Sequence, residues 1–378
     1  MAVVGGGPAG LYLAWLLKRR DPSTEVTVVE QNPRGATYGW GLVFSERALG
    51  FLQAASPQVY EEIANRSRRW DDQVIAHRGQ AVHIDGLSFS GIGRLALLEV
   101  LQAQCERAGV ELRFETRLEA PPSPEAYDLV VGADGVNSVV RQAFSEHFEP
   151  SSQMLTNRYV WYGTHQLFDA LTLTFRQHRE GAFVAHHYPH SDTTSTFVVE
   201  CDAPTFQKAG LDRLSEDESR RYCEEVFADD LGGKGLLTNR SVWIAYRVVT
   251  NRRWSFRNVV LIGDALRTVH FSIGSGTRSA MEDAIALDQA LADHPTDVPR
   301  ALQAFEAARR PEVEKFLAIA QSSYTWYEQF REKLQLSPIQ LAYDYVQRSG
   351  RISHERLKAR SPEFAARYEA SLASEATR

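Results

Sequence analysis

Three glycines near the N-terminus constrain the fold more than any other feature of this chain. They occur as Gly5-x-Gly7-x-x-Gly10, directly after the apolar run Ala2–Val4 and before leucines at helical spacing. Gly5 permits a tight turn, Gly7 lets the backbone approach a pyrophosphate, and Gly10 allows the helix to pack closely on the strand. A second apolar run follows at residues 26–29. The segment is therefore predicted to be a strand, a turn, a helix and a second, parallel strand.

This unit offers a site for an adenine dinucleotide. The predicted helix follows the glycine turn, which includes Pro8 and Ala9, and its first turn presents free backbone N–H groups and a positive dipole to phosphates. Glu30 ends the second strand, about twenty residues past Gly10, where its carboxylate can accept hydrogen bonds from ribose hydroxyls. The alternative is an incidental glycine turn, and the motif alone does not separate NAD from FAD.

A second motif follows the apolar strand at residues 128–131. It continues as Gly132-Ala133-Asp134-Gly135. An Asp-Gly pair after a strand is ordinarily a turn. On this motif alone, a turn and a cofactor role for Asp134 both stay open.

A third motif follows the apolar strand at residues 259–262. The strand delivers Gly263 and Asp264, and the loop Gly274-x-Gly276-Thr277 then opens a helix. A carboxylate at Asp264 can hold a polyol hydroxyl, and the helix N-terminus suits a group that becomes anionic. The ribityl chain and the reduced ring system of FAD are such groups. No second strand–helix–strand unit follows, so this loop is not interpreted as another nucleotide fingerprint.

The three motifs in this order, with an antiparallel sheet between the second and third, resemble the single-component aromatic flavoprotein hydroxylases of the para-hydroxybenzoate hydroxylase type. The resemblance covers essentially the whole chain. It implies FAD as cofactor, and NADH or NADPH as a co-substrate that reduces FAD without a domain of its own. It also implies that an Arg at a helix start lies against FAD, and Arg94 occupies that place. The alternative for Arg94 is an ordinary helix-start cation.

A closer resemblance is to the salicylyl-CoA and 2-aminobenzoyl-CoA hydroxylases, and the violacein-pathway hydroxylase shares several of the same stretches. The stretches are residues 38–45, 159–164, 185–197, 270–277 and 351–355. Two departures from the wider family bear on the substrate rather than on FAD. The family's Gly-Asp-Ala-Ala-His is Gly-Asp-Ala-Leu-Arg here, ending at Arg267, and a usual proline beside the flavin is replaced by His270-Phe271.

The expected fold is α/β (α+β): a Rossmann-like FAD-binding domain with an inserted antiparallel-sheet substrate domain and C-terminal helices. Apolar residues alternate with polar ones between about residues 157 and 250, which is typical of an antiparallel sheet. The parallel-strand pattern then returns, so the first domain is discontinuous. The expected division is a FAD-binding domain (1–75, 90–156 and 251–298), a substrate domain (76–89 and 157–250) and a helical segment (299–378) with a kink or restart at Pro311.

Three residues are candidates for the chemistry of the substrate. The resemblance places His270 beside the flavin ring. There it either orients the substrate or moves a proton, or it only packs against its neighbours. His186 and Tyr188 share a face of one strand and could hydrogen-bond a phenol or aniline. The alternative is that His186 makes its hydrogen bonds within the sheet and has no role toward a substrate. His187 faces the other way and is expected at the surface.

Composition excludes several other classes. The chain has 378 residues, with 42 basic and 48 acidic side chains and a net charge of −6, which argues against a nucleic-acid binder. Its apolar stretch at residues 11–17 is far too short to span a membrane. Three widely spaced cysteines form no disulfide framework and favour a reducing, cytoplasmic compartment. The eleven histidines show no metal-ligand spacing, so no metal is expected.

The function that follows is transfer of one oxygen atom of O2 to an electron-rich aromatic ring, with FAD and NAD(P)H. A small aromatic acid, possibly held as a CoA thioester such as salicylyl-CoA or 2-aminobenzoyl-CoA, is the expected substrate, and the oligomeric state stays open. Two clusters, Arg66/Arg68/Arg69 and Arg252/Arg253/Arg257, are either CoA phosphate sites or solvated surface. The alternatives are a hydroxylase of a free aromatic or indole intermediate, a hydride-only FAD oxidoreductase, and a non-catalytic flavin-binding protein.

Overall fold

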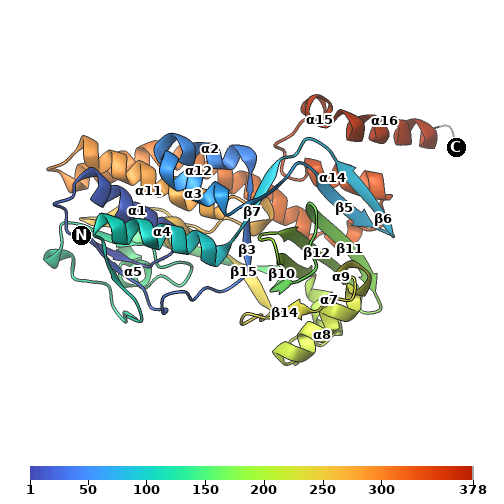
Figure 1. Ribbon diagram of the computed structural model, residues 1–378, viewed down its shortest axis with the longest axis horizontal. Helices are drawn as coiled ribbons and strands as arrows, with labels where there is room; N and C mark the ends of the chain where they lie inside the picture. The colour runs from blue at the N-terminus through green and yellow to red at the C-terminus, as the bar shows by residue number, and fades with distance from the viewer. Residues whose placement is uncertain (377–378) are drawn as a thin grey trace.

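A computed structural model describes residues 1–376 of the chain (Figure 1). Two lobes lie side by side, with the N-terminus in one and the C-terminus at the far end of the other. The expected helical segment 299–378 is described as far as residue 376, and residues 377–378 lie outside the described part.

The first lobe is built on a six-stranded sheet in the order β16-β17-β9-β1-β2-β8. Five of its strands are parallel, and only β16 runs antiparallel to its neighbour. The four inner strands β17, β9, β1 and β2 have short apolar sequences that are buried or nearly so, as a parallel sheet covered by helices requires. The edge strands β8 and β16 are less buried. The strands are β1 (Ala2–Val4), β2 (Thr27–Val29), β8 (Glu111–Arg113), β9 (Val130–Gly132), β16 (Ser255–Phe256) and β17 (Val259–Leu261).

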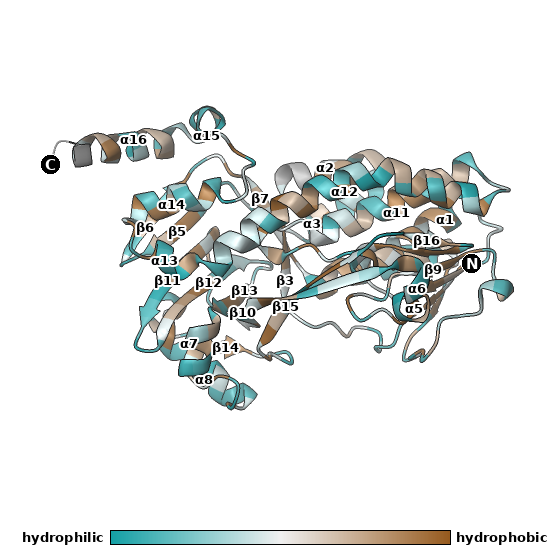
Figure 2. Ribbon diagram, turned by 180° about the vertical axis from the view of Figure 1, so that it is seen from behind, coloured by the Kyte–Doolittle hydropathy of each residue, from teal (hydrophilic) through white to brown (hydrophobic). Residues whose placement is uncertain are grey.

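Long helices cover this sheet and form most of the first hydrophobic core. Helix α1 is buried along nine consecutive residues because α4 and α11 pack on either side of it. Figure 2 shows hydrophobic residues along the strands and hydrophilic ones on the outer sides of the helices. The helices of this lobe are α1 (Pro8–Arg20), α2 (Glu46–Ala55), α3 (Pro57–Asn65), α4 (Arg94–Ala108), α5 (Val139–Ala143), α6 (Ser145–Phe148), α10 (Gly263–Leu266), α11 (Gly276–Asp293) and α12 (Val298–Glu328), with a 3-10 turn at Pro124–Ala126.

The second lobe is built on an eight-stranded, largely antiparallel sheet in the order β14-β10-β13-β12-β11-β5-β6, with β15 paired to β10. Only the β11–β5 pair is parallel. The strands are β5 (Gln73–His77), β6 (Gln80–Ile84), β10 (Pro150–Thr164), β11 (Leu171–His178), β12 (Gly181–Pro189), β13 (Ser195–Cys201), β14 (Leu236–Leu237) and β15 (Ile244–Asn251). A small sheet of β3 (Gly41–Ser45), β7 (Phe89–Gly93) and β4 (Arg68–Trp70) lies between the lobes.

Both faces of the large sheet are covered, which corrects the expectation that His187 lies at the surface. His187 is only 2% exposed: its ring stacks on Phe197, and its Nε2 lies 3.0 Å from the Thr174 hydroxyl. The cover on this face is the helical insert of α7 (Ala203–Lys208), α8 (Glu216–Val226) and α9 (Ala228–Leu231), which packs with the sheet into a separate core. Strand alternation alone does not show that a second layer follows in the chain.

The C-terminal helices cover the opposite face of the same sheet. Helix α12 continues through Pro311 without a break, and its end and the following helices bury aromatic residues against β5, β11 and β12. These helices are α13 (Phe330–Lys333), α14 (Pro338–Gln347), α15 (His354–Arg360) and α16 (Pro362–Ala376). Strands β5 and β10 begin at Gln73 and Pro150, a few residues before the boundaries expected for the substrate domain.

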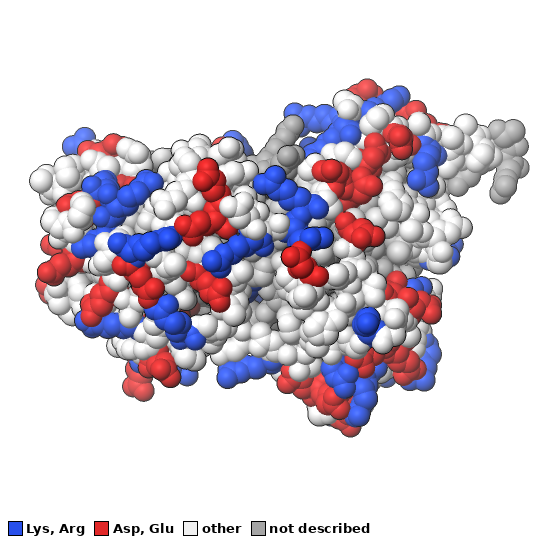
Figure 3. All heavy atoms as spheres, in the orientation of Figure 1, with Lys and Arg blue, Asp and Glu red and all other residues white. Residues whose placement is uncertain are grey.

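Two properties of the described chain concern its surroundings. No helix within residues 1–376 has the length and apolar character needed to cross a membrane. Basic and acidic side chains are interspersed over the face shown in Figure 3, without one continuous basic surface.

Candidate cofactor and substrate site

A cavity of about 1190 Å³ lies where the two lobes meet. One end is formed by the glycine turn before α1 and by the loops around α10 and α11. The middle is formed by strands β3, β10, β12 and β13, and the far end by α14 and α15. All three sequence motifs contribute residues to its wall.

The three glycines of the first motif differ in what surrounds them. Gly5 has a φ of +107°, and a Cβ there would lie 2.3 Å from the Ala133 carbonyl oxygen. A Cβ on Gly10 would lie 2.1 Å from the Gly5 carbonyl oxygen, so that position tolerates no side chain. A Cβ on Gly7 would meet no atom within 4 Å, because Gly7 faces the cavity at the start of α1. The open space at Gly7, beside Pro8 and Ala9 and the free N–H groups of α1, fits a pyrophosphate.

Glu30 holds the glycine turn from the end of β2. Its Oε2 accepts a hydrogen bond from the Gly6 N–H at 2.8 Å, and its Oε1 accepts two from Asn32, at 2.8 Å and 2.7 Å. A carboxylate has about four acceptor positions, so these three bonds leave room for a ribose hydroxyl. A second cavity of about 560 Å³ begins at the adjoining Gln31 and Asn32.

Asp264 reaches the cavity from a turn with left-handed backbone at the preceding glycine. Gly263 has a φ of +60°, and the next residue, Asp264, is exposed and lines the cavity. Burial raises the pKa of Asp264, and the positive charges of Arg267 and Arg94 oppose that effect. Arg94 lines the same cavity, and burial lowers its pKa while Asp264 raises it. This pair of opposite charges would lie against a bound cofactor.

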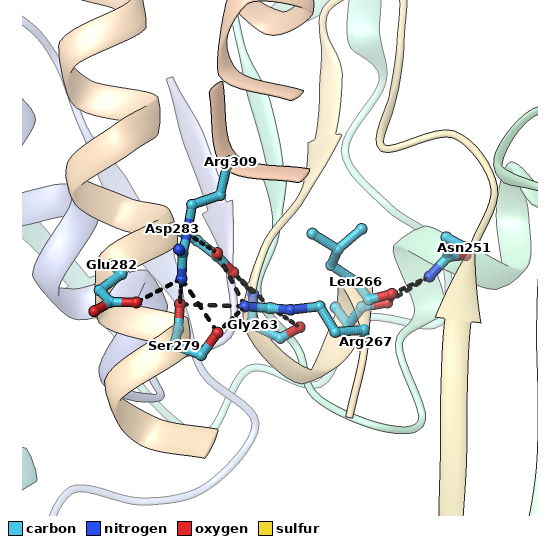
Figure 4. Close-up of polar contacts among 9 residues, drawn as sticks. Asn251, Gly263, Leu266, Arg267, Ser279, Glu282, Asp283 and Arg309 are labelled. Carbon is cyan, nitrogen blue, oxygen red and sulfur yellow. Dashed lines mark hydrogen bonds and ion pairs between the residues drawn. The ribbon is translucent and has the colours of Figure 1, made fainter. Parts of the chain in front are cut away.

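A buried network fixes the turn that carries Asp264 (Figure 4). Arg267 donates hydrogen bonds to both carboxylate oxygens of Asp283, at 2.6 Å and 3.0 Å, and Asp283 also accepts the Gly263 N–H at 3.0 Å. Arg309, from α12, donates to Asp283 at 3.0 Å and to Glu282 at 2.8 Å. The Arg that departs from the family's usual His thus ties the loop to α11.

The third motif ends at the N-terminus of α11. Gly274, Gly276 and Thr277 all line the cavity, and Gly274 has a φ of +57°. The first N–H groups of an 18-residue helix therefore point to the same space as Asp264. This arrangement suits a ring system that gains negative charge on reduction.

Asp134 occupies a different position from the one its motif suggested. Its neighbours Ala133 and Gly135 line the cavity, whereas Asp134 itself does not. Its Oδ2 accepts hydrogen bonds from the N–H groups of Val139 and Val140, at 2.7 Å and 3.4 Å. Its Oδ1 is buried without a hydrogen-bond partner among the described residues, and burial raises the pKa of Asp134. The observed contacts are those of a cap at the start of α5.

Two of the three catalytic candidates line the cavity together. His186 and Tyr188 extend from the same face of β12. The Tyr188 hydroxyl donates a hydrogen bond to the Gly41 carbonyl at 2.8 Å, and burial raises the pKa of Tyr188. Tyr188 therefore stays protonated and committed to β3.

His270 lies outside the cavity wall, although its neighbours Val269 and Phe271 line it. Its Nδ1 is 2.8 Å from the Ser272 hydroxyl, and its ring packs on Phe271 and Tyr246. Burial, with the charges of His186 and Arg348, lowers the pKa of His270 to about 3. The contacts that His270 makes here are this hydrogen bond and ring packing.

Sequence reasoning missed two features of the site. Glu200 is buried beside His186 at an ion-pair distance of 3.5 Å. An acid directly after the apolar residues 197–199 was the only signal for it. Arg348, Arg351, Arg356 and Arg360 line the far end of the cavity. They follow from how the C-terminal helices pack, which no local pattern encodes.

The cavity fits FAD on these observations: open backbone at Gly7, a carboxylate at each of Glu30 and Asp264, and a helix N-terminus at α11. Comparison with known proteins agrees. A family described as FAD binding domain matches residues 126–320, just over half of the chain. A family described as NAD(P)-binding Rossmann-like domain matches residues 3–47.

Three relatives match nearly the whole chain. Salicyloyl-CoA 5-hydroxylase of a Streptomyces species is 37% identical over 92% of this chain and 69% of that protein. Protodeoxyviolaceinate monooxygenase of Chromobacterium violaceum is 36% identical over 91% of this chain and 92% of that protein. The 3-hydroxy-4-methyl-anthranilyl-[aryl-carrier protein] 5-monooxygenase of Streptosporangium sibiricum is 36% identical over 93% of this chain and 94% of that protein.

A solved structure shows the same fold. The tetrameric form of 2-methyl-3-hydroxypyridine-5-carboxylic acid oxygenase superposes with a TM-score of 0.72 at 19% identity, covering 86% of this chain and 92% of that one. The predicted fold class and the predicted FAD and NAD(P)H dependence are confirmed. The chain belongs to the family of single-component FAD-dependent aromatic hydroxylases, the monooxygenases that use NAD(P)H and O2.

Proposed function

We propose that this hydroxylase acts on an electron-rich aromatic acid that is held as a thioester on a phosphorylated arm, in the cytoplasm. One observation carries the proposal: the cavity extends past His186 and Tyr188. It continues to an end lined by Arg348, Arg351 and two further arginines. The three buried free cysteines are consistent with a reducing compartment.

The charge at this end of the cavity is only partly neutralised. Arg348 donates hydrogen bonds to the Ser323 hydroxyl and to the carbonyls of Tyr345 and Ser272, which are all uncharged acceptors. Burial and the like charges of Arg278 and Arg348 lower the pKa of Arg351. An anion bound here would relieve that repulsion, and Arg is suited to binding phosphate.

The two arginine clusters singled out in the sequence lack this property. Arg66 and Arg68 pair with Glu99 and Asp192 at exposed positions, and Arg69 is exposed too. The second cluster is also exposed and paired: Arg252 and Arg253 with Glu149, and Arg257 with Glu125. Arginines already neutralised at the surface are poor candidates for a phosphate subsite.

Two of the relatives support the thioester class by name. One acts on salicyloyl-CoA and another on an anthranilyl group on an aryl-carrier protein. The third acts on protodeoxyviolaceinate, a name without a thioester. A free aromatic or indole intermediate is therefore the competing substrate class, and the arginine-lined end favours the phosphorylated one.

The residues of the chain would bind FAD and position the substrate as follows. FAD, when bound, supplies the redox chemistry by accepting hydride from NAD(P)H and activating O2. The turn at Gly7 and the α1 N-terminus would hold its pyrophosphate, Glu30 a ribose hydroxyl, and Asp264 the ribityl chain. The walls formed by β10, β12 and β13 exclude water and position the ring. Reaction requires a near-attack distance of about 3–3.5 Å.

The test compares aryl-CoA thioesters with the corresponding free acids, measuring hydroxylated product by mass and NAD(P)H oxidation by absorbance. We expect product from a thioester and a KM for it that rises about tenfold or more in Arg351→Gln. The same substitution should leave the KM for a free acid unchanged. Arg252→Gln, at an exposed and paired position, is the control. Equal kcat/KM for thioester and free acid in the wild type would contradict the proposal, and a KM for NADPH that rises in Arg351→Gln would reassign the site to the nicotinamide nucleotide.

A further inference from the structure

A buried carboxylate faces the histidine that lines the cavity. The Oε2 of Glu200, on β13, lies 3.5 Å from the Nε2 of His186, on the neighbouring strand β12. That separation is within ion-pair range and somewhat longer than an ordinary N–H···O hydrogen bond of about 2.7–3.2 Å. Each of the two atoms is buried and has no hydrogen-bond partner among the described residues. Each is therefore available to the other.

Glu200 is held in place from behind. Its Oε1 accepts a hydrogen bond from the Asn157 side-chain amide at 2.8 Å, and the same amide donates to the Tyr327 carbonyl at 2.8 Å. The Asn157 backbone N–H in turn donates to Glu328 at 2.9 Å. The other carboxylate oxygen, Oε1, is thus held between β10 and the end of α12.

The buried charge of Glu200 requires a partner that compensates it. Glu200 is 2% exposed, and an ionised carboxylate without a charged or strongly hydrogen-bonding partner is costly in the interior. Among the described residues, His186 is the only basic side chain within ion-pair distance of it. Its charge also reaches the cavity wall: burial and the negative charges of Glu200 and Asp264 raise the pKa of Tyr159, which lines the cavity.

Two aromatic side chains pack against the ring of His186, and its two nitrogens have different surroundings. The ring stacks on Tyr327 at 5.2 Å and meets Phe271 edge-on at 5.6 Å. Nε2 faces Glu200. Nδ1 is not among the buried atoms without a partner, and the residue lines the cavity, so Nδ1 is the nitrogen left to meet a ligand there. A bare Nε2 against a carboxylate would be repelled, so the neutral ring carries its proton on Nε2.

We propose that Glu200 is a positioning residue that keeps His186 in the Nε2–H form, so that Nδ1 accepts a proton from the aromatic substrate. This inference rests on the proposed function. The proton moves from the donor hydroxyl or amino group of the ring to Nδ1, and the electron pair of that bond stays on the donor and activates the ring. Glu200 then faces an imidazolium and stabilises its charge. No oxidant or reductant takes part in this step.

The tautomer of His186 tests the proposal without relying on activity. We would record the ring ¹⁵N shifts of His-labelled protein at neutral pH, with His186→Gln to assign the signals. The expected wild-type spectrum shows a protonated Nε2 and a bare Nδ1. In Glu200→Gln, which keeps the shape but loses the charge, both tautomers should be populated. Asp202→Asn removes another buried carboxylate just after the same strand and should leave the His186 signals unchanged.

A second arm measures product per NAD(P)H on a substrate that the wild type hydroxylates. Glu200→Gln should reduce product formation by about a hundredfold, the lower end of the range for proton-transfer catalysis, while NAD(P)H oxidation and FAD content stay near wild type. A wild-type Nδ1–H tautomer, the same tautomer in wild type and Glu200→Gln, or unchanged product yield in that variant would overturn the proposal. If no aromatic substrate is hydroxylated at all, the proposed function fails instead, and the tautomer measurement still decides the role of Glu200.

Discussion

Arg267 and Asp283 form a fully buried ion pair, with 2.6 Å between Nη1 and Oδ2. Both residues also bond to Gly263: Asp283 accepts its N–H, and Arg267 donates to its carbonyl at 3.1 Å. The peptide groups on both sides of this turn are therefore fixed to α11. Asp264, the next residue, and the N-terminus of α11 are held as one unit around the cavity.

Breaking this network should be costly in a way that a surface ion pair is not. Removing one partner of a buried pair typically destabilises a protein by about 3–5 kcal/mol, and an exposed pair contributes about 0–1 kcal/mol. We expect Arg309→Met to lower the free energy of unfolding by about 3 kcal/mol and to reduce FAD occupancy. The matched control is the adjacent Arg310→Met, which removes a more exposed pair with Glu306. Chemical denaturation measures both, and equal losses in the two variants would contradict the account.

The glycines of the first motif should separate binding from stability. Gly7→Ala places a methyl group in open cavity, so the FAD-free protein should keep its free energy of unfolding while FAD affinity falls at least tenfold. Gly10→Ala drives a methyl group into the Gly5 carbonyl and should destabilise the fold itself. Fluorescence titration with FAD and chemical denaturation distinguish the two. Tight FAD binding by Gly7→Ala would remove the pyrophosphate assignment.

Asp264 should lower the stability of the FAD-free protein and strengthen FAD binding. Because burial raises its pKa above the unfolded value of 3.8, the contribution of Asp264 to stability is greatest below that pH and is lost as the pH rises through the folded-state pKa. At neutral pH, Asp264→Asn should therefore stabilise the FAD-free protein. The same change removes a charged acceptor and should weaken FAD binding by about 1.5–3 kcal/mol. Melting curves with and without FAD give both quantities, and a variant that is less stable without FAD would refute the assignment.

Three buried histidines should make the protein sensitive to mild acid. Burial lowers the pKa of His187 and His270 to about 3 and that of His190 to about 4. The unfolded chain takes up these protons near pH 6.5. The free energy of unfolding should therefore fall as the pH decreases from 6.5 toward 4, by about 1.4 kcal/mol per pH unit for each histidine.

Denaturation at pH 7, 6 and 5 measures this slope. His187→Asn should reduce the slope, whereas His83→Asn, at an exposed position, should not. A stability that stays constant from pH 7 to pH 5 would show that these rings are protonated in the folded state.

The sequence was most informative where a backbone requirement is local. Gly5, Gly7 and Gly10, the acids after β2 and β17, and the alternation of the second sheet all follow from strand and turn chemistry, and each predicted an element that the structure contains. The shared face of His186 and Tyr188 followed from strand parity.

Tertiary packing decided the rest. The layer of α7–α9 buries His187. The docking of α12 brings Asn157 and Glu328 behind Glu200, and the C-terminal helices deliver Arg348 and Arg351 to the cavity. None of these contacts joins residues that are close in the chain, so no local pattern could reveal them.

The central claim is that an oxygen atom from O2 enters the ring of an aryl thioester within this cavity. The most direct measurement is the product mass after reaction of the FAD-loaded protein with an aryl-CoA thioester, NAD(P)H and ¹⁸O2. The account predicts a hydroxylated thioester that carries one ¹⁸O atom. Oxidation of NAD(P)H with no labelled product from any aryl thioester, or labelling of the free acids alone, would contradict it.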